Sequence, residues 1–204
     1  MVGMMLLLPQ VTVAQSAAPE VNLSASRDGE FVNVSASVEL HVDRDLAWSV
    51  LTDYEQYPRF VTSLNESRVI ARGPDNLVLE HKGEFRFLLF SQKIELRLLV
   101  IEYPQYAVAS QAIDGSFREF TSRYELLPLA DKGVRLVYTA RFVPGFSLPP
   151  IIGMTVVEFA MRRDLSQLAG EIVRRGALAD LRGESCGIMQ APRDAKAKDE
   201  IHRL

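Results

Sequence analysis

From Ser67 to Phe142 the sequence alternates between apolar and polar residues almost without interruption, which is the period of β-strands with one buried face. Short segments with glycine, proline and aspartate break this pattern, and each is long enough for a turn but too short for a parallel crossover. Neighbouring strands are therefore expected to be antiparallel. The alternation predicts strands over Ser67–Arg72, Leu77–Phe85, Ser91–Glu102, Tyr106–Ile113, Phe117–Leu127 and Val134–Phe142.

Three further segments complete the predicted fold. Phe31–Val42 alternates strictly and is expected to be the first of seven strands. Two short helices follow it, Arg44–Thr52 and a segment from Tyr54 to about Leu64 that bends at a proline. After the last strand, two prolines precede a helix from Ile151 to about Leu181, whose apolar residues recur at spacings of three and four. The expected fold class is α+β, with a curved seven-stranded antiparallel sheet wrapped around one long C-terminal helix.

This architecture predicts a cavity. The terminal helix is the only predicted element large enough to cover the apolar face of the sheet, and a straight helix cannot fill the space on both of its sides. Where the straight helix does not follow the curved sheet, either large side chains fill the gap or an apolar cavity remains. Hydrophobic residues make up 48% and charged residues 24% of the 204, which is typical of a globular protein with a substantial core. The domain is expected to span residues 27–181.

The composition also excludes several classes of function. A formal net charge of −3 argues against a strongly cationic nucleic-acid binder, and no nucleic-acid partner is expected. The single cysteine, Cys186, cannot form an intrachain disulfide or a site with several cysteine ligands, and the three histidines are scattered. Motifs such as G-x-S-x-G, H-E-x-x-H and G-x-G-x-x-G are absent, so no catalytic residue, metal or cofactor is predicted.

Two short motifs accompany this order of elements. One is a D-Y-x-x-Y-P run that begins at Asp53, and the other is a D-G-x-F run that begins at Asp114. Over residues 32–175 the chain resembles the START-like (SRPBCC, helix-grip) superfamily. The most similar part of it is the branch of polyketide cyclases/dehydrases and coenzyme Q-binding proteins, which also includes ribosome-association toxins. The resemblance implies a helix-grip fold with a hydrophobic pocket for a lipid, a quinone or a polyketide-like molecule, and it implies no fixed reaction.

Strand alternation and the helical stripe identify candidate lining residues of such a pocket. Tyr124 and Tyr138 are favoured because a buried phenol needs a hydrogen-bond partner, which a ligand carbonyl can supply. His81 is the only histidine predicted to face inward, and it either contacts a ligand or is an ordinary interior histidine. For each of the other candidates, the alternative is likewise an ordinary core residue that contacts no ligand. The candidate ligand-binding residues are His81, Phe85, Phe120, Tyr124, Tyr138, Phe142, Val157 and Met161.

Two apolar segments exceed what a core requires. Phe85–Phe90 falls where two strands turn, and Ile151–Met161 is apolar on nearly every side of the predicted helix. Such surfaces indicate a portal, a partner surface or peripheral membrane contact, unless the sheet edge and the first helices bury them. The basic pairs Arg162-Arg163 and Arg174-Arg175 are interpreted as the solvated face of the same helix.

The two ends of the chain differ from the middle. Residues 1–18 contain a short apolar run followed by small residues, which resembles a secretory signal peptide, although no lysine or arginine precedes the run. We therefore expect a secreted or periplasmic protein of a bacterium, or a cytoplasmic one if this leader is not a signal. Residues 182–204, which include Cys186, lack apolar periodicity and are predicted to form a disordered tail.

Three functions are compatible with these patterns. The first is a non-enzymatic carrier or chaperone of a hydrophobic small molecule. The second is a polyketide cyclase or dehydratase in which His81 and a pocket tyrosine move protons. The third is a protein-interaction role like that of the ribosome-associated branch. The predicted cavity and the missing catalytic motifs favour the first.

Overall fold

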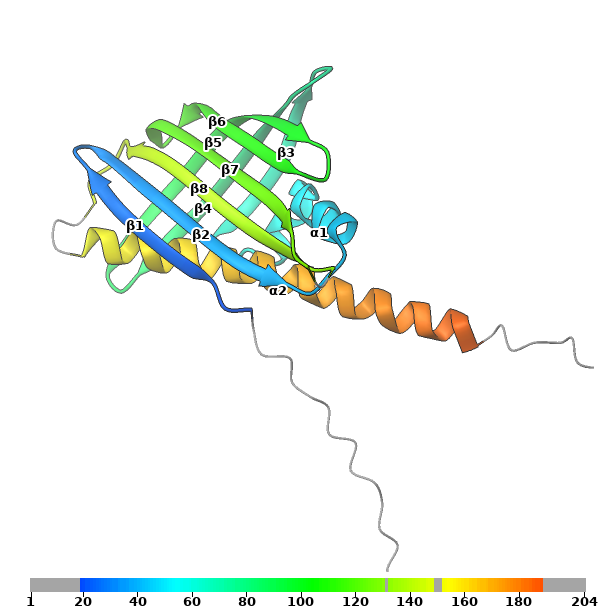
Figure 1. Cartoon of the computed structure of the whole chain (residues 1–204). Coiled ribbons are helices and arrows are strands. Elements are labelled where there is room, and N and C mark those ends of the chain that lie inside the picture. The colour runs from blue at the N-terminus through cyan, green and yellow to red at the C-terminus, as the bar shows by residue number, and fades with distance from the viewer. Residues whose placement is uncertain (1–18, 131, 149–151, 189–204) are drawn as a thin grey trace, which may run out of the picture.

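The computed structural model describes residues 19–130, 132–148 and 152–188, and its elements follow the predicted order (Figure 1). The leader at 1–18 and the residues from 189 onward lie outside this range, so the signal-peptide prediction is not tested. The strands are β1 (Asn22–Asp28), β2 (Phe31–Leu40), β3 (Leu64–Arg72), β4 (Leu77–Phe87), β5 (Phe90–Tyr103), β6 (Ala107–Gly115), β7 (Phe117–Pro128) and β8 (Val134–Pro144). The helices are α1 (Arg44–Leu51), the 3₁₀ helix η1 (Tyr54–Arg59) and α2 (Gly153–Ile188).

The strands form one antiparallel sheet in the order β1-β2-β8-β7-β6-β5-β4-β3. Every neighbouring pair except β2 and β8 is joined directly along the chain, as the short turns predicted. The sheet curves around α2, and α1 and η1 lie at one end of it (Figure 1). The α+β helix-grip fold is therefore confirmed.

The predicted number of seven strands is wrong because β1 was missed. This strand pairs with β2 through a tight hairpin at Gly29, whose φ of 59° suits glycine. Its sequence, NLSASRD, has too few apolar residues to alternate visibly. Arg162 of α2 donates hydrogen bonds to the backbone carbonyls of Val21 and Leu23, so a side chain distant in sequence helps to hold this edge. The domain accordingly begins before the predicted residue 27.

Helix α2 is also longer than predicted, since it continues to Ile188 rather than ending near Leu181. The prediction of a disordered tail is therefore wrong for residues 182–188, where Cys186 belongs to the helix. Figure 1 shows that this last part of α2 extends past the sheet. A helix that has left the core needs no apolar stripe to continue, because its backbone hydrogen bonds propagate cooperatively.

The core lies between the concave face of the sheet and α2. Leu40, Leu126 and Leu136 of the sheet and Leu168 and Ile172 of α2 are all buried. Helix α2 lies close to the start of α1 at Gly176, where a Cβ atom would lie 2.9 Å from a side-chain carbon of Val42 and 3.3 Å from one of Leu46. One end of the sheet is thus sealed by helix packing. Among the described residues, no helix is long and apolar enough to span a membrane.

Candidate functional site

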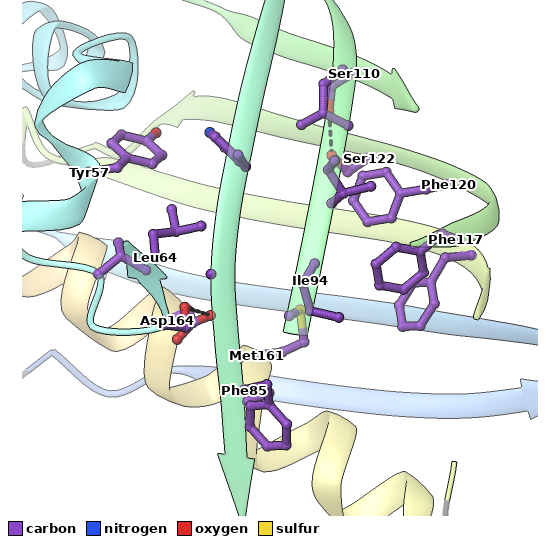
Figure 2. Close-up of a pocket in the computed structure, with 18 of the residues that line it drawn as sticks. Tyr57, Leu64, Phe85, Ile94, Ser110, Phe117, Phe120, Ser122, Met161 and Asp164 are labelled. Carbon is purple, nitrogen blue, oxygen red and sulfur yellow. Dashed lines mark hydrogen bonds between the residues drawn. The ribbon is translucent and has the colours of Figure 1, made fainter. Parts of the chain in front are cut away.

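A cavity of about 260 Å³ lies between the concave face of the sheet, η1 and α2 (Figure 2). Its wall is mostly aliphatic and aromatic, with a small number of polar groups, which is the usual composition of a small-molecule site. Ligand pockets commonly measure about 300–1,000 Å³. A compact molecule therefore suits this cavity better than a lipid with two acyl chains.

The eight residues predicted from strand alternation and helical spacing all line this cavity. Several of them, including Tyr138 and Phe142, belong to the main core cluster at the same time. Their position is as predicted, and their binding of a ligand stays a prediction. They are His81 and Phe85 of β4, Phe120 and Tyr124 of β7, Tyr138 and Phe142 of β8, and Val157 and Met161 of α2.

One part of the wall, which we call the apolar end, is built from phenylalanine rings. Phe117 lies 5.3–5.6 Å from Phe120, Phe142 and Phe146, measured between ring centroids. Phe85 completes this end by packing against Val156 and Ala160 at the start of α2. These contacts are edge-on, tilted or stacked aromatic pairs that make no demand for a polar partner.

The D-G-x-F motif positions Phe117 at the apolar end. Gly115 has a φ of 124°, and a Cβ atom there would lie 2.1 Å from the carbonyl oxygen of Glu95. Only glycine fits this close approach of β5 and β6. The chain turns here, the Ser116 amide donates to the same carbonyl, and β7 begins with Phe117 facing the cavity. The motif therefore shapes the cavity wall and supplies one of its aromatic rings.

The opposite part of the wall, which we call the polar end, contains Tyr57, His81, Tyr124 and Tyr138. Tyr57 comes from the D-Y-x-x-Y-P motif on η1, and its hydroxyl donates a 2.6 Å hydrogen bond to the Leu51 carbonyl. Burial raises the pKa of the Tyr57 phenol, so it stays neutral. The hydroxyl of Tyr57 is thus already committed to holding η1 against α1.

His81 is the unusual group at the polar end. Its Nε2 atom is buried and has no hydrogen-bond partner among the described residues. The ring lies 6.2 Å from that of Tyr57. Burial lowers the pKa of the His81 imidazole from an ordinary value of 6.5 to about 4, so the ring is neutral at pH 7. A neutral imidazole has one donor and one acceptor nitrogen, and either can serve a ligand oxygen or hydroxyl.

Tyr124 and Tyr138 lie against each other across β7 and β8, with ring centroids 4.6 Å apart. Burial raises the pKa of both phenols, so both are donors at neutral pH. Both tyrosines line the cavity. Nearby, the Ser110 and Ser122 hydroxyls are paired with each other at 2.7 Å (Figure 2).

Asp164 of α2 also lines the cavity, and the sequence analysis missed it. It accepts hydrogen bonds from the Ser63 hydroxyl at 2.7 Å and from the Arg163 guanidinium at 3.1 Å. Burial raises the pKa of the Asp164 carboxyl, while Ser63 and Arg163 oppose that effect. The available signal was its spacing, because Asp164 falls three residues after Met161 on the apolar stripe of the helix.

The charged residues among the described lining of the cavity are both acidic. Asp164 and Glu84 are its acidic lining residues, and no lysine or arginine is among the described residues that line it. Arg163 lies close, with its guanidinium 5.7 Å from the Phe85 ring centroid, but it is engaged with Asp164. The described lining residues therefore offer no free cation that would neutralise a carboxylate or a phosphate.

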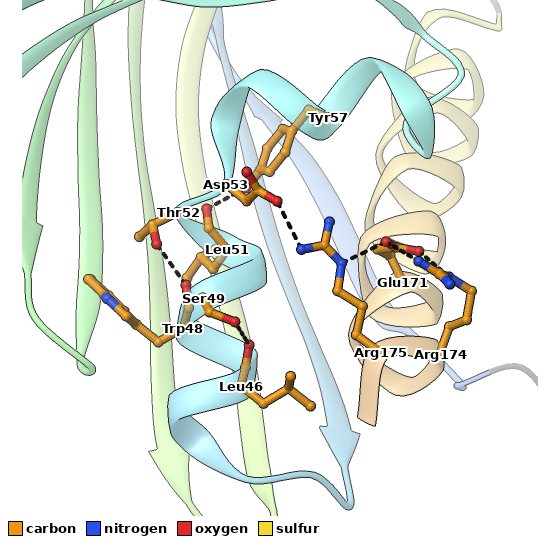
Figure 3. A network of polar contacts seen from close by, with 10 residues as sticks. All are labelled: Leu46, Trp48, Ser49, Leu51, Thr52, Asp53, Tyr57, Glu171, Arg174 and Arg175. Atoms are coloured by element: carbon orange, nitrogen blue, oxygen red, sulfur yellow. Dashed lines mark hydrogen bonds and ion pairs between the residues drawn. The ribbon is translucent and has the colours of Figure 1, made fainter. Parts of the chain in front are cut away.

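The polar end is fastened from outside by an ion-pair network (Figure 3). Arg175 of α2 donates to Asp53 at 2.8 Å and to Glu171 at 2.8 Å, and Arg174 pairs with Glu171 as well. Asp53, the first residue of the D-Y-x-x-Y-P motif, thus ties the junction of α1 and η1 to α2. The interpretation of the basic pairs as a merely solvated face is wrong for Arg162, Arg163 and Arg175, since each binds a specific partner.

The two apolar segments singled out in the sequence are partly exposed. Leu88 is 84% exposed and Leu89 is fully exposed at the tip of the β4–β5 hairpin, and Phe159 of α2 is 45% exposed. Leu88 has a φ of 51°, a left-handed conformation that branched aliphatic residues rarely adopt. The alternative that both segments are buried is therefore wrong at these positions. The hairpin tip adjoins the apolar end, because Phe85 of the same hairpin packs on α2.

Fold and cavity together define a helix-grip protein with an internal apolar chamber, and known structures share this architecture. The aromatase/cyclase ZhuI from a Streptomyces species superimposes with a TM-score of 0.61 at 19% identity, covering 71% of this chain and 95% of that one. A STAR-related lipid transfer protein from Xanthomonas axonopodis gives 0.58 at 14% identity, covering 77% and 94%. Human STARD10 gives 0.60 at 14% identity, covering 84% and 82%. At these identities the likeness establishes the fold alone.

The sequence itself identifies the family. The family model described as polyketide cyclase / dehydrase and lipid transport matches residues 40–169, which is more than half of the chain. This protein therefore belongs to that family, as the resemblance predicted. A comparison with curated protein sequences gives no significant match.

Proposed function

We propose that this protein binds one hydrophobic small molecule in the cavity and carries or protects it without transforming it. The observation that carries the proposal is the unfilled apolar space of about 260 Å³. A core that serves stability alone is packed with few voids larger than a water molecule. The family description includes lipid transport, and one structural neighbour is titled a lipid transfer protein. Both support the proposal.

The direct test is extraction of the protein purified under native conditions, followed by mass spectrometry of what is released. We expect a stoichiometric apolar compound. The variant Val157→Phe adds a ring inside the cavity and should lower the amount recovered at least severalfold. The matched control is Val137→Phe, which makes the same change outside the cavity, in β8, and should leave recovery unchanged.

Two outcomes would redirect the proposal. Equal recovery from Val157→Phe and wild type would place the compound outside the cavity. Chemical conversion of an added ligand, lost in His81→Ala and Tyr124→Phe, would favour the cyclase or dehydratase alternative instead. A clean protein that binds no quinone, fatty acid or sterol would contradict the carrier function.

The proposal includes peripheral contact with a lipid surface at the β4–β5 hairpin tip. Leu88 and Leu89 expose their side chains on the hairpin whose Phe85 belongs to the apolar end, so a bilayer would cover the tip and deliver an apolar ligand to the same place. We expect Leu88→Ser combined with Leu89→Ser to reduce sedimentation with phosphatidylethanolamine and phosphatidylglycerol vesicles. The control is Ile70→Ser, since Ile70 is 46% exposed on β3, outside the cavity. Unchanged sedimentation of the double variant would remove membrane contact from the proposal.

Export forms the last part of the proposal. The signal-like composition of residues 1–18 supports a location outside the cytoplasm. N-terminal sequencing of the protein from its native host is the test, and we expect the mature chain to begin near residue 15–19. Recovery of the chain from the cytoplasm with this leader intact would contradict it.

A further inference from the structure

We propose that the polar end of the cavity recognises a neutral oxygen group, a carbonyl or a hydroxyl, on an otherwise apolar ligand through His81 and Tyr124. This inference rests on the proposed function and specifies the chemical class of the ligand. It predicts that the protein distinguishes alcohols and ketones from carboxylates with the same carbon skeleton.

Two polar residues of the cavity wall, His81 and Tyr124, can bind a ligand oxygen. The Nε2 atom of His81 is buried and makes no hydrogen bond to any described residue. Tyr124 also lines the cavity, and its neutral phenol is a hydrogen-bond donor. An unpaired polar group in the interior destabilises a fold, and native proteins contain few of them. A ligand oxygen in the cavity would give the His81 nitrogen the partner it lacks and would accept from the Tyr124 hydroxyl.

Other polar groups in the wall are already paired. The Tyr57 hydroxyl donates to Leu51, Ser110 is paired with Ser122, and Ser63 is paired with Asp164. Among the described residues, the buried side-chain atom left without a partner is His81 Nε2. His81 lies 6.2 Å from Tyr57 between ring centroids, and Tyr124 lies 4.6 Å from Tyr138 on the wall of the same cavity. At this end of the cavity, one ligand group would meet both His81 and Tyr124.

Charge also favours a neutral ligand. Asp164 and Glu84 line the cavity, and the described lining residues include no lysine or arginine. A carboxylate ligand would lose its hydration and gain no counter-ion from these residues, so its binding is disfavoured. An ammonium ligand finds no free anion either, because Asp164 is already paired with Arg163 and Ser63, and Glu84 with Arg86 and Ser91. The neutral donors and acceptors of His81 and Tyr124 match an equally neutral ligand group.

The experiment uses four probes with one ring skeleton: naphthalene, 2-naphthol, 2-acetonaphthone and 2-naphthoate. Their dissociation constants for the ligand-depleted full chain are measured by titration calorimetry at neutral pH. Naphthalene reports the apolar cavity alone, and its binding tests the proposed function. We expect 2-naphthol and 2-acetonaphthone to bind about 2- to 10-fold more tightly than naphthalene, the gain from one net hydrogen bond. We expect 2-naphthoate to bind at least about 10-fold more weakly than 2-naphthol.

Variants assign the preference to the two residues. Tyr124→Phe removes only the hydroxyl and should abolish the advantage of 2-acetonaphthone over naphthalene, measured as the ratio of the two dissociation constants in the same variant. His81→Leu should reduce the advantage of 2-naphthol in the same way. Because His81→Leu removes an unpaired buried polar atom, the thermal midpoint of this variant should equal or exceed that of the wild type. Such a midpoint would exclude misfolding as the cause of the lost preference. The control is Tyr106→Phe, outside the cavity, which should alter neither the ligand preference nor the thermal midpoint.

The outcomes separate the two proposals. If naphthalene binds but 2-naphthol has no advantage, or 2-naphthoate binds equally well, the inference is overturned and the carrier function stands. If the preference persists in both Tyr124→Phe and His81→Leu, another group makes the contact and the inference is also overturned. If none of the four probes binds, the proposed function fails together with the inference.

Discussion

The two ends of the cavity are built by different physical means. At the apolar end, four phenylalanine rings satisfy one another by packing, and the hairpin beside them exposes two leucines. At the polar end, hydrogen bonds and ion pairs hold η1 and α2 in place, yet the Nε2 atom of His81 has no partner among the described residues. The apolar end is thus satisfied by its own packing, whereas the polar end keeps a buried nitrogen that our proposal assigns to a ligand.

Gly83 lies between the two ends on β4, with His81 on one side of it and Phe85 on the other. A Cβ atom there would lie 2.0 Å from the carbonyl oxygen of Ser63. We expect Gly83→Ala to lower the free energy of unfolding by about 3 kcal/mol or more, because the backbone of Ser63 and Leu64 must move away from the added carbon. Urea denaturation measures this change.

The control for this substitution is Gly170→Ala in α2, where an added Cβ atom meets nothing within 4 Å. It should raise the free energy of unfolding by about 0.5–1 kcal/mol through the better helix propensity of alanine. If Gly83→Ala were as stable as wild type, β3 and β4 would not approach as closely as described, and the two ends would be less tightly joined.

The second largest effect is expected from pH at the polar end. The pKa of His81 is about 4 in the folded protein against an ordinary 6.5, so between these values only the unfolded chain takes up the proton. Stability due to a neutral His81 is therefore present above pH 6.5 and is lost as the pH falls towards 4. The difference in pKa corresponds to about 3 kcal/mol. The measurement is the free energy of unfolding of wild type and His81→Leu across this range.

Comparison with His81→Leu separates this effect from other titrating groups. The carboxyls of Asp164 and Glu84, which also line the cavity, and the phenol of Tyr57 are present in both proteins. The difference between the free energies of unfolding of His81→Leu and wild type should increase as the pH falls. A constant difference would show that the His81 ring reaches solvent. Such a result would remove the main physical difference between the two ends.

The smallest effect on stability is expected from the ion-pair network outside the polar end. Asp53→Asn breaks the ion pair with Arg175 and should lower the free energy of unfolding by about 0.5–1 kcal/mol, because both side chains are about a third exposed. The loss should shrink in high salt, and Asp180→Asn on the exposed part of α2 should have no such effect. An effect much above this range would show that Asp53 has a role beyond the pair.

The lining of the cavity was largely predictable, since a period of two assigns each side chain of a strand to one face. His81, Tyr124 and Phe142 were placed on the inner face by that rule, and all three line the cavity. Phe146 was missed because it follows β8 in an irregular segment where no period applies. Asp164 was missed because the neighbouring sequence does not show what a single acidic residue on an apolar helical stripe would bind. Its partner Ser63 is distant in sequence.

The sequence by itself determined the order of the elements, their antiparallel pairing and the face on which each side chain lies, because these follow from local periodicity and turn length. Only the tertiary structure decided that β1 joins the sheet, that Arg162 and Arg175 bind specific partners, and that about 260 Å³ remains empty. A cavity is a small difference between the volume that a curved sheet and a helix enclose and the volume that their side chains fill. Local patterns carry no measure of that difference, and the same holds for the missing partner of His81.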